Sequence, residues 1–222
     1  WYTRKKVGKE HSMTKKNLPL PPSLPTLIPG DFYLEEEKIF EGALLEDADC
    51  SYDTCKNLLL KQCQLKKITL QKTRLEQWEC QHVVFEQCDF SNLECYGASF
   101  HRVVFKQCKL TGTNFADSYL RDCTFIDCTA NFSSFSNTNI RTMLIDHCQC
   151  NDSEFTEVDW KHLTLKENQL NNSNWFHTKL ASLDFRSNRF EKIALSMAQL
   201  KGLVVDQEQA LIIAAGLGLV ID

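Results

Sequence analysis

The chain repeats its apolar residues at a fixed spacing, and this period constrains the fold more than any other feature of the sequence. The stretch VVFEQCDF begins at Val83 and VVFKQCKL begins at Val103, so a motif returns after twenty residues with its apolar letters kept and its charged letters changed. Every fifth position from Leu60 to Val205 holds an apolar residue or a cysteine, without a polar exception. Two positions earlier in each pentad, a small or medium residue is usual.

A period of five fits neither of the two common secondary structures. An amphipathic helix repeats its apolar residues at intervals of three and four, and a half-buried strand repeats them at every second position. A chain that turns a corner every five residues does fit, because each straight side then presents one large and one small residue inward. Four such sides close a square coil of twenty residues. With parallel strands ~4.8 Å apart, roughly eight coils would form a rod about 38 Å long. The sequence therefore predicts an all-β parallel β-helix over residues 40–205.

The two ends of this rod need covers, because each coil buries its centre only against its neighbours. The segment NLPLPPSLPTLIPG is rich in proline and cannot join a strand ladder. We therefore expect residues 13–39 to form an extended N-terminal cap that lies over the first coil. Residues 1–12 are polar and patternless, and we expect them to be a tag or a disordered tail.

At the other end the period stops, and DQEQALIIAAGLGLVID follows. Asp206 is predicted to be the N-cap of a helix over Gln207–Ala215, with Gln209 completing a capping box and Gly216 serving as the C-terminal cap. The alternation of Leu217, Leu219 and Ile221 predicts a short strand after it. Residues 206–222 thus form a separate apolar tail, and so much apolar surface at an end usually covers a partner.

Composition excludes several classes of function. The net charge of -4 lacks the basic surplus of nucleic-acid binders, so we expect no direct nucleic-acid binding. No window is long and apolar enough to span a bilayer, and no export signal is evident, so we expect a cytoplasmic protein without a membrane partner. The eleven cysteines are expected to be free thiols in that compartment. Because phosphate-binding loops, nucleophile elbows and redox cysteine pairs are missing from the sequence, we expect neither a cofactor nor an enzyme.

The pieces TNFAD, SYLRD and SNLEC resemble the signature of the pentapeptide-repeat proteins, which form a right-handed quadrilateral β-helix. Within that group the chain is similar to the Qnr-type fluoroquinolone-resistance proteins, through its PLPP segment, FHRVVF, LTGTNFADSYLRDC and its apolar ending. It most resembles the loopless chromosomal members of Gram-positive bacteria. The resemblance implies DNA mimicry, binding to DNA gyrase and topoisomerase IV, and protection of both from quinolones. Because the period never slips, any such contact must come from the sides or ends of the rod.

The same resemblance implies a homodimer formed through the C-terminal helix and strand. The residues that would form this interface are the apolar ones of the tail, namely Leu211, Ile212, Ala215, Leu217, Leu219 and Ile221.

Sorting the charged residues by side of the square separates an acidic side from a basic one. The acidic side, centred on Leu75, carries Glu76, Glu94, Asp117, Glu154 and Glu157 against the single base Arg74, counted from residue 58. The basic side, centred on Leu60, carries Lys61, Arg102, Arg121, Arg141, Lys161, Lys179 and Lys201 against Glu79, Asp122 and Asp159. Duplex DNA carries one charge per ~1.7 Å, so five acids along the rod amount to partial mimicry.

Other interpretations of these features stay open at this stage. The charged sides could serve solubility, and the rod could be an interaction scaffold for a different protein partner. Five histidines fall at outward positions without a catalytic partner, which favours surface roles: His82, His101, His147, His162 and His177. The acidic run DSEFTEVDW suggests a carboxylate enzyme, but paired acid and base groups need a cleft, and an uninterrupted coil has none.

One column of cysteines admits two interpretations. Cys88, Cys108, Cys128 and Cys148 occupy the same inward position of successive coils. Zinc needs four ligands that converge on one point, whereas these thiols would form a file along the axis. Free cysteine packs as a small hydrophobic residue, and we expect these residues to be part of the core.

Overall fold

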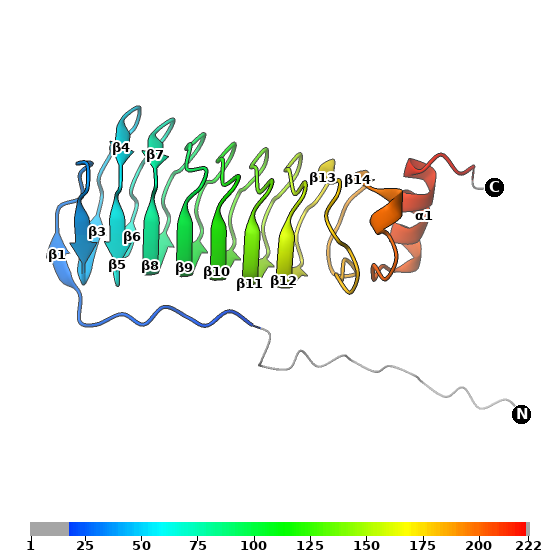
Figure 1. Cartoon of the computed structure of the whole chain (residues 1–222), viewed down its shortest axis with the longest axis horizontal. Helices are drawn as coiled ribbons and strands as arrows, with labels where there is room; N and C mark the ends of the chain where they lie inside the picture. Colours follow the sequence, from blue (N-terminus) through cyan, green and yellow to red (C-terminus); the bar gives the residue numbers. More distant parts are fainter. Residues whose placement is uncertain (1–17, 221–222) are drawn as a thin grey trace, which may run out of the picture.

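The computed structural model describes residues 18–220, and the described chain is a rod of stacked coils with a helix at one end (Figure 1). This is the predicted fold, a parallel β-solenoid of about 8 turns followed by a short helix. Three predicted features lie outside the described residues: the tag or tail at 1–12, the first part of the N-terminal cap at 13–17, and the interface residue Ile221. The strands are β1 (Ile28–Gly30), β2 (Ile39–Glu41), β3 (Ala43–Glu46), β4 (Thr54–Lys56), β5 (Leu59–Lys61), β6 (Gln64–Lys66), β7 (Arg74–Glu76), β8 (Glu79–Glu86), β9 (Ser99–Lys106), β10 (Tyr119–Ile126), β11 (Asn139–Asp146), β12 (Asp159–Lys166), β13 (Ser173–Trp175) and β14 (Ile193–Leu195).

The corners of the coil occur at the spacing that the sequence predicts. Every fifth residue from Glu37 to Ser182 has a positive φ, including many residues other than glycine. Such a backbone conformation is unfavourable for most residues. Each turn is held by hydrogen bonds to the following coil, as when the Gln62 N–H donates to the Gln81 carbonyl at 2.8 Å. A corner every five residues is thus a property of the backbone as well as of the sequence.

The interior is filled by columns of side chains that run along the rod. The Phe105 and Phe125 rings are stacked with centroids 4.6 Å apart, and Phe125 is aligned with Ile145 in the next coil. On another side, the rings of Phe135, Phe155 and Trp175 form a second stack. These shared columns confirm that spacing by five decides which side chains are buried.

The four sides are bonded differently. A ten-stranded parallel sheet covers the basic side and the side that follows it, and β8 to β12 each run through the corner between the two. The acidic side has only the short pairs β4–β7 and β13–β14 with isolated bridges between them. The remaining side has isolated bridges only, such as the one between Thr69 and Asp89.

The predicted N-terminal cap covers the first coil only with its second half, and residues 18–27 lie elsewhere than predicted. From β1 onward the segment joins the first coil: β1 pairs with β3, the Glu37 N–H donates to the Lys56 carbonyl at 2.9 Å, and Phe32 packs on Phe40 over the end. Residues 18–27, here called the N-terminal strap, run along the flank of the rod beneath the sheet toward its other end (Figure 1). The Leu20 N–H donates to Asp122 and the Ser23 N–H donates to His82 Nδ1. The sequence prediction missed this because proline content indicates an extended chain but not its direction.

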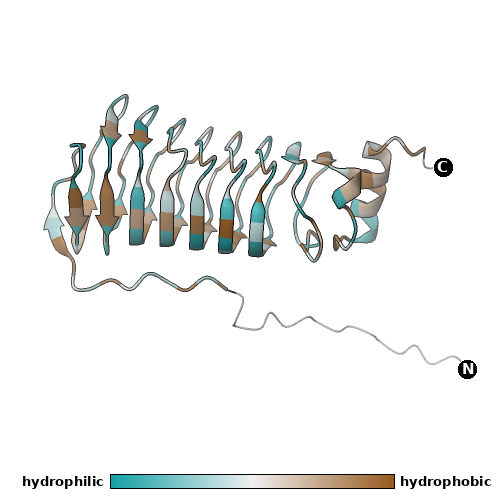
Figure 2. Ribbon diagram, in the orientation of Figure 1, coloured by the Kyte–Doolittle hydropathy of each residue, from teal (hydrophilic) through white to brown (hydrophobic). Residues whose placement is uncertain are grey.

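The C-terminal helix α1 (Gln207–Gly216) begins as predicted, with Asp206 as N-cap and a complete capping box with Gln209. Its end differs from the prediction, because Gly216 is still helical and Gly218 takes the positive φ that ends it. No strand follows among the residues described up to 220, so the predicted strand is not present there. Most of α1 is apolar (Figure 2). No helix among residues 18–220 is both long and apolar enough to cross a membrane.

Candidate protein-binding surfaces

The acidic side presents four carboxylates that no cation neutralises. These four residues are exposed and take part in no ion pair within residues 18–220: Glu94, Asp117, Glu154 and Glu157. Neutral donors hold two of them in place. The Asn114 amide donates to Glu94 at 2.8 Å, and the Asn174 amide donates to Glu154 at 2.8 Å. Their negative charges therefore remain available to a partner.

Glu76, the fifth predicted member of this side, does not contribute in the same way. Its carboxylate lies 3.0 Å from Lys56 Nζ and 3.1 Å from Arg74 Nε. The hydrogen bond from Lys56, together with the charges of Lys56 and Arg74, lowers the pKa of Glu76. The charge count by sides began at residue 58 and so omitted Lys56, which lies one coil earlier on this side. The acidic surface consequently begins at Glu94.

Charges on the sheet sides form ladders of opposite sign. Lys61 pairs with Glu41 at 2.7 Å, Lys106 with Glu86 at 2.7 Å, and Arg141 with Asp159 at 2.7 Å, each across one coil. Exposed pairs of this kind contribute little to stability, because water screens the attraction between their charges. They do remove net charge from their surface, whereas Glu94, Asp117, Glu154 and Glu157 have no such partner among residues 18–220.

The cysteines and the other possible metal ligands do not form a metal site within the described residues. No group of three or more histidine, cysteine or acidic side chains among them is arranged to hold a metal ion. All eleven thiols are free, and the predicted file of cysteines packs in the core, with Cys148 Sγ 3.4 Å from the Cys128 backbone nitrogen. Burial raises the pKa of Cys123 and of Cys150 to about 12, so both thiols are protonated and unreactive at neutral pH.

The predicted histidines do not converge on a site either. His82 and His101 lie next to each other with ring centroids 5.8 Å apart, beneath the N-terminal strap. His147 and His177 are exposed, and His147 bridges Asp146 and Glu167 on the sheet surface. His162 is half-buried and lines an opening in the rod.

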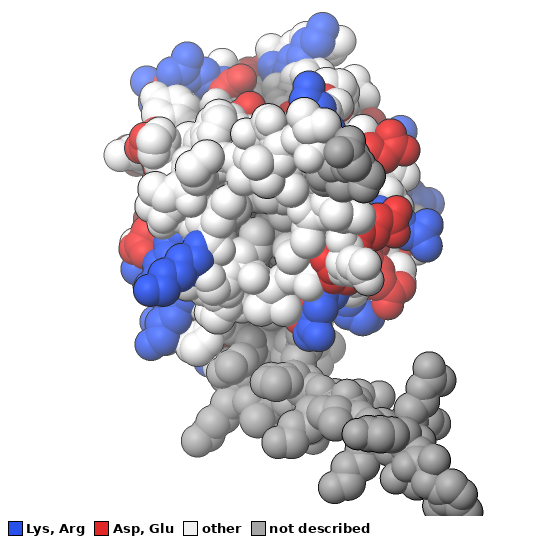
Figure 3. All heavy atoms as spheres, turned by 90° about the vertical axis from the view of Figure 1, so that its right-hand side faces the viewer, with Lys and Arg blue, Asp and Glu red and all other residues white. Residues whose placement is uncertain are grey.

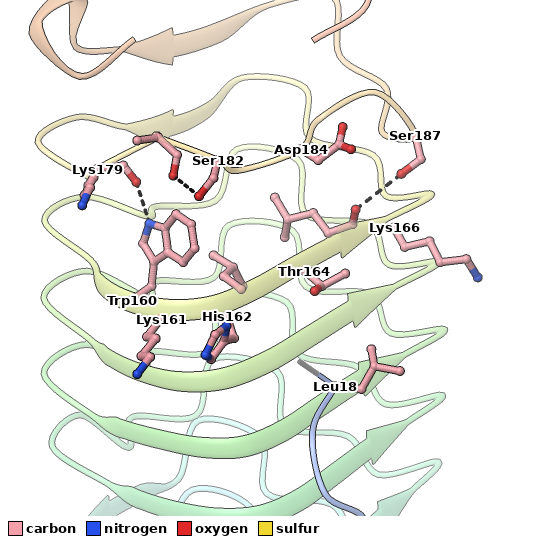
Figure 4. Close-up of a pocket in the computed structure, with 13 residues that line it drawn as sticks. Leu18, Trp160, Lys161, His162, Thr164, Lys166, Lys179, Ser182, Asp184 and Ser187 are labelled. Carbon is pink, nitrogen blue, oxygen red and sulfur yellow. Dashed lines mark hydrogen bonds between the residues drawn. The ribbon is translucent and has the colours of Figure 1, made fainter. Parts of the chain in front are cut away.

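That opening is the feature that sequence reasoning missed. A cavity of about 520 Å³ lies between β12 and residues 179–187, although the five-residue period continues through both segments (Figure 4). The prediction of a coil without a cleft is therefore wrong at this place. One signal was in the sequence, because Trp160 and Trp175 belong to one coil and give it the bulkiest set of central residues.

The C-terminal end of the rod is apolar. Seen along the axis, its centre is almost free of charged side chains, which form a rim around it (Figure 3). Of the predicted interface residues, Leu211, Ala215 and Leu219 are exposed, while Ile212 and Leu217 are half-buried. An apolar groove of about 240 Å³ lies beside Leu219 between α1 and the last coil.

Comparisons with known proteins agree on the type of repeat. Residues 98–175 match a family model described as a pentapeptide repeat region, and residues 79–116 match pentapeptide repeats (8 copies). A sequence search of curated proteins finds no match to this chain.

Among solved structures, the chain is similar to HetL, a pentapeptide repeat protein involved in heterocyst differentiation regulation from the cyanobacterium Nostoc sp. strain PCC 7120. The TM-score is 0.55 at 15% identity, over 77% of this chain and 70% of HetL. QnrB1, a plasmid-mediated fluoroquinolone resistance protein, gives a TM-score of 0.41 at 14% identity in a trypsin-treated variant, over 90% of this chain and 98% of that one. Its full-length structure gives 0.40 at 12% identity, over 86% and 100%. The likeness to HetL extends to the fold alone.

Proposed function

We propose that this chain, a pentapeptide-repeat protein, is a non-catalytic rod that binds the type II topoisomerases DNA gyrase and topoisomerase IV where DNA would lie and protects them from fluoroquinolones. The observation that carries the proposal is the acidic side, on which Glu94, Asp117, Glu154 and Glu157 keep their charge without a cation among the described residues. The sequence resemblance to Qnr-type proteins supplies the identity of the partner.

The spacing of these carboxylates sets the character of the contact. Glu94 and Glu154 lie in one column three coils apart, a distance of about 14 Å at the usual strand separation. Duplex DNA would carry about eight charges over that length. The acidic side is therefore a sparse imitation of a phosphate backbone. Affinity for a basic enzyme surface should fall with added salt, because salt screens charges that remain exposed.

A supercoiling assay with purified gyrase and ciprofloxacin tests this function. We expect the protein to restore supercoiling, and we expect a variant with Glu94→Gln, Asp117→Asn, Glu154→Gln and Glu157→Gln to lose most of this protection. The matched control neutralises four exposed or half-exposed acids on the other sides, namely Glu79, Asp127, Asp152 and Glu191, and should protect like the parent. If no concentration restores supercoiling before the protein itself inhibits the enzyme, the topoisomerase proposal is wrong and another protein partner becomes the better explanation.

We also propose that two copies associate through the C-terminal end. Leu211 is 47% exposed and Leu219 is 63% exposed, and both belong to the apolar end described above. Burying such an end against a second copy would remove its apolar surface from water. Leu211→Glu is expected to shift the protein from dimer to monomer in sedimentation equilibrium, whereas Phe176→Glu, which alters an exposed ring on the acidic side, should leave the association unchanged. A parent protein that sediments as a monomer would contradict the interface.

A further inference from the structure

The sheet of the rod ends at β12, although the coiled chain continues beyond it through β13, residues 179–187 and β14. β12 pairs with β11 in full register, from Asn139 opposite Asp159 to Asp146 opposite Lys166. It is the last strand in the order of the ten-stranded sheet. Within residues 18–220, no backbone-to-backbone hydrogen bond joins β12 to residues 179–186, where the next strand would lie. One edge of β12 thus presents amide and carbonyl groups without backbone partners to the cavity of about 520 Å³.

Side-chain contacts hold this opening in place. Trp160 points across it from β12, and its indole nitrogen donates to the Lys179 carbonyl at 2.6 Å (Figure 4). At the other end of the opening, the Leu165 carbonyl accepts from the Asn188 amide at 3.2 Å, and the Ser187 hydroxyl lies 3.4 Å from the same oxygen. The neighbouring coil therefore meets β12 through bridging side chains at its two ends, Trp160 at one end and Ser187 with Asn188 at the other, and not through a strand ladder. The edge between the two bridges is left open.

The lining of the opening is cationic. Lys161 and Lys179 are exposed on either side of it, and neither takes part in an ion pair within residues 18–220. Asp159, the acid nearest in register to Lys179, is already paired with Arg141 at 2.7 Å. Asp184 is engaged by the Arg186 guanidinium at 2.7 Å. The two lysines are thus the available charges, and a ligand at this place must be acidic to match them.

We propose that the open edge of β12 binds an extended acidic peptide segment of a partner protein by strand addition. The backbone of the segment would pair with the free edge of β12, as in other proteins that recognise peptides at a sheet edge. The outward side chains of such a strand would lie about 4.8 Å from those of the adjoining strand. Acidic residues at alternate positions would then reach Lys161 on one side and Lys179 on the other.

Two observations favour this occupant over others. The N-terminal strap brings Leu18 to the cavity, but the residues that precede Leu18 in the sequence include Lys15 and Lys16, whose charge does not suit a cationic lining. A free strand edge offers donors and acceptors in alternation, which a peptide backbone matches. The phosphates of a nucleic acid provide acceptors only and would leave the carbonyl groups of β12 without partners.

The proposal is tested with the whole protein and a short capped peptide in which Glu alternates with Thr, labelled for fluorescence anisotropy. We expect saturable binding and slower amide exchange over 160–167 when the peptide is present. A peptide with Lys in place of Glu should not bind. The Glu peptide with every second backbone nitrogen methylated should also bind far more weakly, because methylation removes its ladder donors.

Matched variants separate the edge from general electrostatics. Lys161→Glu with Lys179→Glu should weaken binding of the Glu peptide at least about tenfold, because it places like charges opposite each other. Lys72→Glu with Lys192→Glu makes the same change of net charge on another side and should leave affinity within about twofold.

Each contrary outcome has a definite meaning. No binding of the Glu peptide at millimolar concentration overturns the proposal, and so does undiminished binding of the methylated peptide. Tighter binding of a single-stranded oligonucleotide that is lost in the Lys161 and Lys179 variant would identify a polyanion site instead. None of these results depends on gyrase, so they distinguish this inference from the proposed function.

Discussion

The coils between residues 79 and 166 and the coil at 179–187 follow the same sequence period, yet they are bonded differently. In the first region β8 to β12 pair in sequence along two sides of the rod, and the positive-φ corners recur without a gap. In the second region the inward residues Leu183 and Phe185 are still fully buried, but the ladder to β12 is missing and the corner after Ser182 is not repeated at residue 187. The five-residue period thus determines which side chains are buried. It does not by itself ensure that neighbouring coils come close enough to form a ladder.

The largest expected effect comes from emptying the stack of rings in the regular region. Phe125→Ala removes a ring that stacks on Phe105 at 4.6 Å, on a strand paired along both edges, and should lower the free energy of unfolding by about 3 to 5 kcal/mol. Phe185→Ala should cost clearly less, because the opened coil can relax into the space. Urea titration of both variants measures the difference. The control Phe176→Ala removes a ring that is 43% exposed and should change stability by less than about 0.5 kcal/mol. Equal losses at Phe125 and Phe185 would show that the opened coil is as rigid as the others.

The next effect concerns the contact that fastens α1 to the last coil. The buried Gln209 amide donates to the carbonyls of Phe185 and Asn188, both at 2.8 Å. Gln209→Leu keeps the size of the side chain but leaves both carbonyls without that donor, which should cost about 2 kcal/mol. Amide exchange of α1 should rise first, because the helix is attached to an already loosened coil. Gln207→Leu alters the exposed first turn of the same helix and serves as the control. If the two variants exchange alike, the amide does not hold the helix.

Much of the fold could be predicted because a single geometric rule governs most of the chain. The large inward residue at every fifth position gave the coil, the stacked phenylalanines and the buried cysteines, since burial is set by phase alone. The rule says nothing about Trp160, which occupies a central position yet is only half-buried. A periodic pattern marks positions as apolar but does not show whether two indole rings fit inside one coil.

The candidate site was predictable only in part, for a related reason. Sorting the charged residues by side of the square placed four carboxylates on one surface, because the period determines on which side each residue lies: Glu94, Asp117, Glu154 and Glu157. It failed for Glu76, whose partner Lys56 belongs to the preceding coil. The course of the N-terminal strap was not predictable, because three hydrogen bonds to His82, Gln62 and Asp122 decide it and none follows from a repeat.

A smaller effect is expected from replacing the residue that spans the opening. Trp160→Leu supplies the kind of residue found at 120 and 180 on the same side and removes the bond to the Lys179 carbonyl. We expect the ladder between β12 and residues 179–186 to form, which should slow amide exchange over 160–167 about tenfold. Trp160→Phe separates two causes. If the ladder forms in the Phe variant, the hydrogen bond from the Trp160 indole kept the coil open. If the ladder does not form, the volume of the aromatic ring kept it open. If amide exchange over 160–167 is unchanged in the Leu variant, Trp160 occupies the opening without causing it.

The smallest expected effect is a pH-dependent release of the N-terminal strap from the rod. His82 accepts a hydrogen bond from the Ser23 N–H at 2.9 Å through Nδ1, which requires that nitrogen to be unprotonated. Burial, and then the charge of Arg102, lower the pKa of His82 below its ordinary value of about 6.5. The folded state therefore holds the neutral ring more strongly than the unfolded chain does. Its contribution to stability is complete above about pH 6.5 and declines as the pH falls toward the lower folded value.

Lowering the pH from 7.5 to 5 should consequently release the strap while the coils stay folded. The pKa of His101 is also lowered, first by burial and then by the charge of Arg121, whereas the charge of Asp122 raises it. Protonation of His101 should act in the same direction as protonation of His82. Faster amide exchange at Ser23 and faster proteolysis within 18–27 would report the release, against constant exchange at Phe105 and Phe125. In His82→Phe the strap should be loose at every pH, and in the control His177→Ala the pH response should persist. If the strap of His82→Phe is still released at low pH, another group causes the pH dependence and the role given to His82 is wrong.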